Sequence, residues 1–188
     1  YMSNTKEQKI EKFVKKNKTI PMGDDNIRKY FPKAKIIKYC DLKNLHSIEQ
    51  ILPKHKSFCF LLYQDSPQTG HWVCINRIGS KLEFYDSYGG APDSQLEWTA
   101  PEIRADLGID RPYLSDLFKS SGYNVCYNYI KYQTSSDDVN TCGRHCVFRI
   151  LSMLEHDTDL DQYYEDMLKT KNKLKIPYDK IVSLFVQK

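Results

Sequence analysis

The sequence predicts an α+β fold in which helices flank a central mixed β-sheet, and three observations indicate it. Residues 58–63 form a continuous apolar run, which is typical of a strand buried on both faces. Residues 71–78 and 81–87 alternate around Gly79-Ser80, which predicts a β-hairpin. The segments before and after these strands space their apolar residues as helices do.

The N-terminal third is expected to be mainly helical. Residues 3–17 and 25–31 have helical spacing, and Pro32 ends the second helix. Residues 34–39 read as a strand. Leu42, Leu45, Ile48 and Leu52 then predict a helix over 42–52, with Asp41 as its cap.

The hairpin carries the first chemical information. Glycine at the first turn position favours a two-residue type II′ turn, which pairs Ile75 with Phe84 and Val73 with Asp86. In this register His71 and Asp86 lie on one face as diagonal neighbours, with backbones roughly 7–8 Å apart. The other face, which includes Trp72 and Glu83, is expected to be the more polar one.

The rest of the chain alternates short helices with one more strand. The predicted elements are short helices within 94–119 broken at Pro101, Gly108 and Pro112, a strand over 125–133, a polar loop over 134–138, and helices over 141–155, 158–169 and 177–186. We expect a single domain, 1–188, with an N-terminal region (1–56), a catalytic core (57–155) and closing helices (156–188).

Composition is that of an ordinary globular protein. The 188 residues are 40% hydrophobic and 28% charged, and no apolar run approaches the roughly 18 residues of a membrane span. Because the first residues lack an apolar signal core, we expect an intracellular protein whose six cysteines are reduced. The net charge of +4 includes lysine clusters over 6–18 and 169–175, interpreted as solvated faces or as a contact for nucleic acid.

Cys142 is the candidate nucleophile. It opens a predicted helix, where unpaired backbone N–H groups and the helix dipole favour a thiolate. Gly143 leaves room for a substrate carbonyl, and the N–H of Cys142 is suited to a developing oxyanion. His71 would act as base and Asp86 as the acid that orients its ring.

Other interpretations of the same residues remain open. Cys142 and Cys146 would also suit a helix face buried in the core. His145, three residues along the same helix, is an alternative base. A metal site would combine Cys142, His145 and Cys146 with Cys126, although the paired-cysteine spacing of zinc knuckles is missing.

The blocks Gly70-His71-Trp72-Val73, 84–89 (Phe-Tyr-Asp-Ser-Tyr-Gly) and 141–146 (Thr-Cys-Gly-Arg-His-Cys) resemble the adenovirus maturation protease and the SUMO-specific proteases. The resemblance covers about residues 57–155. It implies a peptidase fold with the nucleophile helix packed on the sheet, a His71, Asp86 and Cys142 triad, and no cofactor or metal. Trp72 and Gly143 would line the substrate cleft.

One position departs from the pattern of the family. Its members place an oxyanion-hole glutamine six or seven residues before the cysteine, where this chain has Ser135 and Ser136. The nearest glutamine is Gln133, nine residues before Cys142, so it is the candidate for this role. A longer loop must then fold back to bring it to the site.

The resemblance leans towards maturation enzymes of large DNA viruses, virophages and related elements. It implies a monomer that cleaves viral capsid or core precursors, located in the host cytoplasm or nucleus or packaged in the virion. Some relatives use DNA as an activator, which the lysine clusters would fit. Alternative functions are a deconjugase for ubiquitin-like modifiers, an acetyltransferase, and a non-enzymatic capsid accessory that binds nucleic acid.

Overall fold

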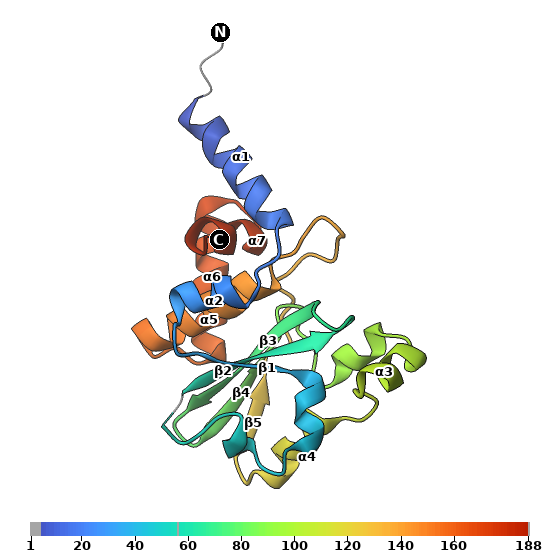
Figure 1. The fold of residues 1–188 in the computed structure, drawn as a ribbon. Helices are drawn as coiled ribbons and strands as arrows, with labels where there is room; N and C mark the ends of the chain where they lie inside the picture. The colour runs from blue at the N-terminus through green and yellow to red at the C-terminus, as the bar shows by residue number, and fades with distance from the viewer. Residues whose placement is uncertain (1–4, 56, 188) are drawn as a thin grey trace.

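A five-stranded mixed β-sheet forms the centre of the computed structural model, which describes residues 5–55 and 57–187 (Figure 1). Its strands lie side by side in chain order: β1 (Lys35–Lys38), β2 (Phe58–Gln64), β3 (Gly70–Ile78), β4 (Lys81–Tyr85) and β5 (Asn124–Tyr127). β1 runs parallel to β2 and β5 parallel to β4, whereas β3 is antiparallel to both its neighbours. The predicted α+β fold with a mixed sheet is confirmed.

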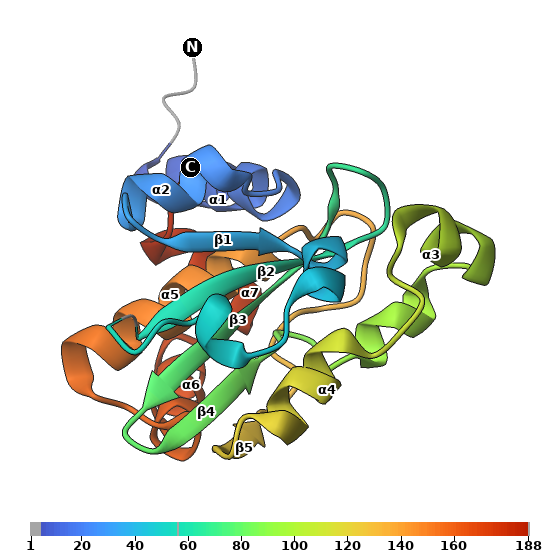
Figure 2. The same cartoon turned by 60° about the horizontal axis from the view of Figure 1, so that its bottom comes forward.

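Helices cover both faces of this sheet (Figures 1 and 2). One side carries α2 (Asp24–Tyr30), α5 (Cys142–His156), α6 (Leu160–Leu174) and α7 (Tyr178–Phe185), and α1 (Lys6–Thr19) packs on α7. The other side carries α3 (Pro101–Leu107), α4 (Tyr113–Ser120) and the 3₁₀ helices η1 (Tyr39–Asn44), η2 (Ile48–Gln50) and η3 (Ser94–Trp98).

Each face has its own hydrophobic core, because successive strand residues point to opposite sides. Phe60 and Cys74 pack with Val147 and Ile150 of α5, whereas Leu61 and Ile75 belong to the second core. The prediction that residues 58–63 are buried on both faces is therefore confirmed.

The hairpin has the predicted register. Ile75 pairs with Phe84, and Gly79 has the positive φ, 57°, that the turn requires. β4 ends at Tyr85, so Asp86 lies just beyond the strand.

The prediction of a polar second face on this hairpin is wrong, because α5 covers it. Trp72 is buried there, and so is Glu83. The Glu83 carboxylate accepts hydrogen bonds from Arg149 Nε (2.8 Å) and Nη2 (2.7 Å) on α5. A complementary charge on the covering helix thus allows an acidic residue to be buried.

The predicted helix over 42–52 is also wrong, although its apolar residues do face the core. Two short 3₁₀ helices, η1 and η2, replace it. Gln50 Oε1 accepts the backbone N–H groups of His46 (2.7 Å) and Ser47 (3.0 Å), a local alternative to helical hydrogen bonds.

The predicted strand over 125–133 is too long. β5 stops at Tyr127 because Asn128 turns to bond the backbone of Asp86 on both sides, at 2.9 Å (N–H) and 2.7 Å (C=O). The remaining helices agree with the predicted segments to within a few residues, except that α6 continues to Leu174; residues 3 and 4 lie outside the described part of the chain.

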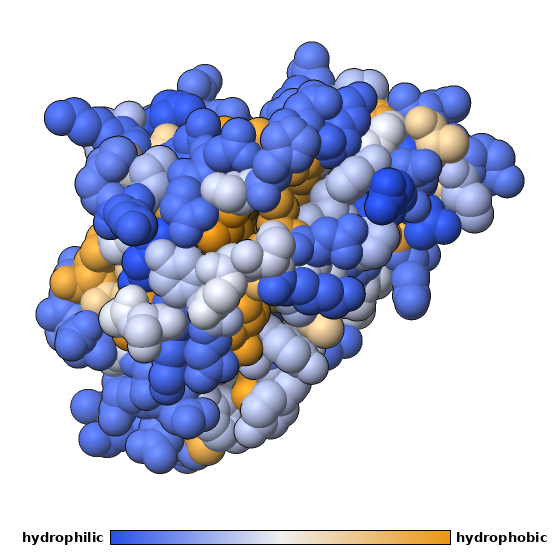
Figure 3. All heavy atoms as spheres, turned by 90° about the horizontal axis from the view of Figure 1, so that it is seen from below, coloured by the Kyte–Doolittle hydropathy of each residue, from blue (hydrophilic) through white to orange (hydrophobic). Residues whose placement is uncertain are grey.

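The surface of the protein does not test the expected DNA contact or the expected monomeric state. The face in Figure 3 is mostly hydrophilic, and its hydrophobic atoms show mainly within hollows. No helix in the described ranges is long and apolar enough to span a membrane. Lys9, Lys12, Lys15 and Lys16 of α1 lie exposed. A DNA contact there, a monomeric state and the proposed division within the single domain stay predictions.

Candidate active site

The candidate nucleophile lies where the helix α5 begins. Cys142 is the first residue of α5, and only 9% of it is exposed. Thr141 occupies the N-cap position, but its side chain makes no cap hydrogen bond. Its hydroxyl instead donates to Asp179 Oδ1 at 2.5 Å. The sulfur of Cys142 interacts with the backbone N–H groups of Trp72 and Gly143, which favour its anion.

His71 joins this thiol to a carboxylate. It lies near the beginning of β3, and its Nε2 is 2.6 Å from Asp86 Oδ1. The interaction of its ring with Cys142 raises the pKa of His71 and lowers that of the thiol, so these two side chains are neighbours. Because Nε2 bonds to Asp86, Nδ1 is the nitrogen left for the thiol. Side chains from β3, the end of β4 and α5 thus lie together, with His71 between Asp86 and Cys142.

His71 and Cys142 each stabilise the charged form of the other. Burial alone would lower the pKa of His71, but the hydrogen bonds and charges of Asp86 and Cys142 outweigh it and raise that pKa to about 10. Burial would likewise raise the pKa of Cys142. The hydrogen bond and charge of His71, with backbone hydrogen bonds from Trp72 and Gly143, lower it instead. The arrangement favours a thiolate beside an imidazolium.

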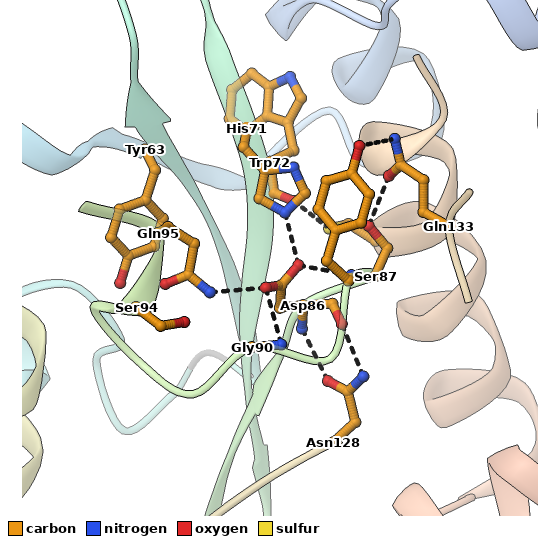
Figure 4. Close-up of polar contacts among 12 residues, drawn as sticks. Tyr63, His71, Trp72, Asp86, Ser87, Gly90, Ser94, Gln95, Asn128 and Gln133 are labelled. Atoms are coloured by element: carbon orange, nitrogen blue, oxygen red, sulfur yellow. Dashed lines mark hydrogen bonds and ion pairs between the residues drawn. The ribbon is translucent and has the colours of Figure 1, made fainter. Parts of the chain in front are cut away.

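Asp86 is held by four donors (Figure 4). Its Oδ1 accepts from His71 and from the N–H of Tyr88 (2.9 Å), and its Oδ2 from Gln95 Nε2 (2.7 Å) and the N–H of Gly90 (3.2 Å). Burial would raise the pKa of this carboxyl, but the hydrogen bonds, led by that of His71, lower it. Asp86 therefore stays ionised and fixes the orientation of the imidazole.

Sequence reasoning missed several residues around His71. Tyr88 stacks on the imidazole at 5.0 Å between ring centroids, and Trp98 meets it edge-on at 5.2 Å. Gln95 bonds the Asp86 side chain, and Asn128 its backbone. They come from loops and a 3₁₀ helix, whose positions no periodic pattern in the sequence reveals.

Trp72 and Gly143, the predicted substrate-cleft residues, lie next to the site beneath the N-terminal segment. Trp72 is 5% exposed, and its Nε1 donates to the carbonyl of Met22 at 2.9 Å. A Cβ added at Gly143 would lie 2.9 Å from Met22 Cβ, so this position needs glycine for packing. A contact of either residue with substrate remains a prediction.

Gln133 lies beside the site, and its side chain is fully engaged. Its Nε2 donates to the Tyr88 hydroxyl (3.1 Å) and to the carbonyl of Val139 (3.2 Å). Its Oε1 accepts from Ser87 Oγ at 2.8 Å (Figure 4). The bond to Val139 closes the loop that follows Gln133, and the oxyanion role of Gln133 stays a prediction.

The alternative interpretations of the cysteine helix have different outcomes. The expectation that Cys142 and Cys146 are buried in the core is confirmed, because both belong to the same hydrophobic core as Trp72. His145 is fully buried and bonds Asp179 at 3.1 Å, so its ring is paired with a carboxylate other than Asp86. Among residues 5–55 and 57–187, no three histidine, cysteine or acidic side chains are grouped so that they could hold a metal ion.

Comparison with known proteins gives a relative. No protein-family model matches the chain. Its sequence is 32% identical over 153 residues to the uncharacterized protein V9 of Sputnik virophage. The matched region spans 81% of this chain and 85% of V9. The chain belongs to the V9 family. The expected relation to virophages is confirmed by this match.

Solved structures resemble this V9-family chain more distantly. The ASFV pS273R protease is 16% identical with a TM-score of 0.42, over 73% of this chain and 59% of that one. The central domain of Lpg1148 from Legionella pneumophila is 17% identical with a TM-score of 0.38, over 76% of this chain and 80% of that one. ChlaDub1 from Chlamydia trachomatis is 13% identical with a TM-score of 0.33, over 97% of this chain and 76% of that one. Similarity at this level assigns no activity to the V9 family.

Proposed function

We propose that this protein is a cysteine endopeptidase with Cys142 as nucleophile, His71 as general base and acid, and Asp86 as the residue that orients His71. The observation that supports the proposal is the hydrogen bond between Asp86 and His71 together with the interaction of His71 with Cys142 at the start of α5, which lowers the pKa of the thiol. Such a constellation is what activates a thiol for covalent catalysis.

The reaction would run in two halves. The Cys142 thiolate attacks the scissile carbonyl carbon, a C–S bond forms, and the carbonyl oxygen becomes an oxyanion. The tetrahedral intermediate collapses as the C–N bond breaks, and the leaving amine takes its proton from the His71 imidazolium. Water then gives a proton to His71 and attacks the thioester, which releases the acid product and restores the thiolate.

The oxyanion would be stabilised by the backbone N–H of Cys142 and by the amide of Gln133. Both hydrogens of Gln133 Nε2 have acceptors, Tyr88 and Val139. Donation to substrate would therefore exchange the bond to the Tyr88 hydroxyl for one to the oxyanion. That exchange keeps the Val139 bond, which holds the amide close to the helix start.

As substrates we propose capsid or core precursors of a virus or related element. Membership in the family of a virophage protein supports this class. The test is to incubate the protein with co-encoded capsid proteins and to identify new termini by mass spectrometry.

The Cys142→Ala variant should abolish cleavage while leaving the fold intact, because it removes the nucleophilic sulfur and only a small part of the core. Cleavage by that variant at the wild-type rate would contradict the mechanism. A panel of ubiquitin-like electrophilic probes separates the alternative substrate class, since labelling of Cys142 by those probes would favour a deconjugase.

A further inference from the structure

We infer that Asp179 is a positioning residue that holds the candidate oxyanion donor and the nucleophile in register; this inference rests on the proposed function. Asp179 lies in the first turn of α7, 1% exposed, and is remote in sequence from the triad. The segment 134–141, called here the 134–141 loop, connects Gln133 with Cys142.

Both ends of this loop bond to the one carboxylate. The backbone N–H of Thr134 donates to Asp179 Oδ2 at 3.0 Å, directly after Gln133. The hydroxyl of Thr141 donates to Asp179 Oδ1 at 2.5 Å, directly before Cys142. Residues 134–138 between these ends are exposed. The two ends, together with the bond of Gln133 to the Val139 carbonyl, therefore fix the separation of Gln133 and Cys142.

His145 completes the cluster. Its Nε2 lies 3.1 Å from Asp179 Oδ1, one turn after Cys142 on α5. Burial would raise the pKa of Asp179, but the hydrogen bonds from His145, Thr141 and Thr134 outweigh it and lower that pKa to about 2. A charged acceptor thus joins α5, α7 and the start of the loop, and charge-assisted bonds of this kind are the strong ones.

This geometry implies an effect on catalysis separate from thiolate formation. None of the Asp179 bonds reaches His71 or Asp86, so the charges that ionise Cys142 do not depend on Asp179. Loss of the carboxylate should instead let the Gln133 amide drift from the oxyanion position. Because a misplacement of about 1 Å can cost about 10²-fold in rate, the loss should fall on kcat.

The test compares Asp179→Ala, Asp179→Asn and Thr141→Val with wild type. In Asp179→Ala, kcat for the capsid substrate should fall by about 10–100-fold and KM stay within about twofold. The rate of Cys142 alkylation by iodoacetamide should change far less. In Asp179→Asn the side-chain oxygen can still accept from the Thr134 N–H, and the new amide N–H groups can donate to the Thr141 hydroxyl and to the His145 ring. This variant should therefore recover most of kcat. Thr141→Val removes one donor and should give an intermediate loss.

Hydrogen–deuterium exchange gives a readout that needs no substrate. The Thr134 amide should exchange faster in Asp179→Ala, whereas the Asn140 amide, which donates to the Lys18 carbonyl at 2.8 Å, should change less. Glu83→Gln is the matched control, because it also alters a buried carboxylate that touches α5. It should lower the unfolding temperature without changing kcat or Thr134 exchange.

The outcomes separate the two proposals. A kcat of Asp179→Ala within about twofold of wild type, or a fall of kcat and alkylation rate by the same factor, would overturn the positioning role. Unchanged exchange at Thr134 would overturn it as well, even without activity. If wild type and Cys142→Ala cleave equally, the proposed function fails, whatever the exchange of Thr134 shows.

Discussion

At the scale of single residues, His71 is the group on which the site depends, because burial and bonding act on it in opposite directions. A buried imidazole without partners would be neutral, and the raised pKa of His71 exists only because its interactions with Asp86 and Cys142 outweigh burial. Removing either partner should therefore change the charge of the whole hydrogen-bonded chain and not one side chain alone.

Asp86→Asn tests this dependence. The amide oxygen can still accept from His71 Nε2, but the negative charge is lost, so the pKa of His71 falls and that of Cys142 rises. We expect kcat/KM to fall by about 10²–10⁴-fold, by analogy with such a change in other triads. The pH–rate profile of Cys142 alkylation should move to higher pH. Asp137→Asn, an exposed change of the same type, is the control, and an equal loss there would contradict the argument.

Asp179 should make stability depend on acid pH. Its folded pKa is about 2 against an ordinary value of 3.8, so its stabilisation is present above pH 3.8 and lost as pH falls through 2. The difference corresponds to about 2 kcal/mol of unfolding free energy. Urea unfolding of wild type and Asp179→Asn between those pH values measures it. Parallel pH dependences of the two proteins would show that the carboxylate contributes nothing.

At the scale of elements, alternation predicted the hairpin correctly, whereas local polar contacts ended or replaced elements that periodic patterns predicted, as Gln50 does within 42–52. The hairpin register followed from a glycine turn and alternation, and it brought His71 and Asp86 to one end of the sheet. The strand predicted over 125–133 was too long because the side chain of Asn128 bonds the backbone of Asp86 and ends β5 at Tyr127. The burial of the second hairpin face was missed for a different reason. Glu83 and Arg149 form a buried ion pair, but in the sequence alone each is expected to be a charged surface residue.

That ion pair joins β4 to α5 and supplies a prediction at this scale. Arg149→Met leaves the Glu83 carboxylate buried without its partner, which should cost about 3–5 kcal/mol of unfolding free energy. Replacing both by apolar residues, Glu83→Leu with Arg149→Met, should recover much of that loss. Urea denaturation of the two variants measures both effects. A double variant no more stable than the single one would contradict this account.

At the scale of the whole molecule, both ends of the chain converge on the start of α5. From the N-terminal side, the carbonyls of Lys18 and Ile20 accept hydrogen bonds from Asn140 (2.8 Å) and Arg144 (2.6 Å). From the C-terminal side, Asp179 bonds Thr141. The sequence motifs pointed to His71, Asp86 and Cys142 as the proposed triad, but they could not reveal these supports, because each depends on how segments more than 30 residues apart pack.

The N-terminal support leads to a prediction about Gly143. An alanine there would put its Cβ 2.9 Å from Met22 Cβ and 3.3 Å from Trp72 Cδ1, too close without movement of the segment before α2. Gly143→Ala should thus cost about 1–3 kcal/mol of unfolding free energy, as overpacking does, and should lower cleavage because the strain lies beside Cys142.

Met22→Gly removes the atom that clashes, although it also removes buried apolar surface and so destabilises by itself. The double variant should then be more stable than the sum of the two single changes predicts, with an interaction energy of about 1 kcal/mol or more. Thermal and urea unfolding of the two single variants and the double variant measure this double-mutant cycle. Cleavage assays show whether the double variant regains the activity that Gly143→Ala loses. Strict additivity would mean that the N-terminal segment does not press on the nucleophile helix, and the convergence of the chain ends would then be irrelevant to the site.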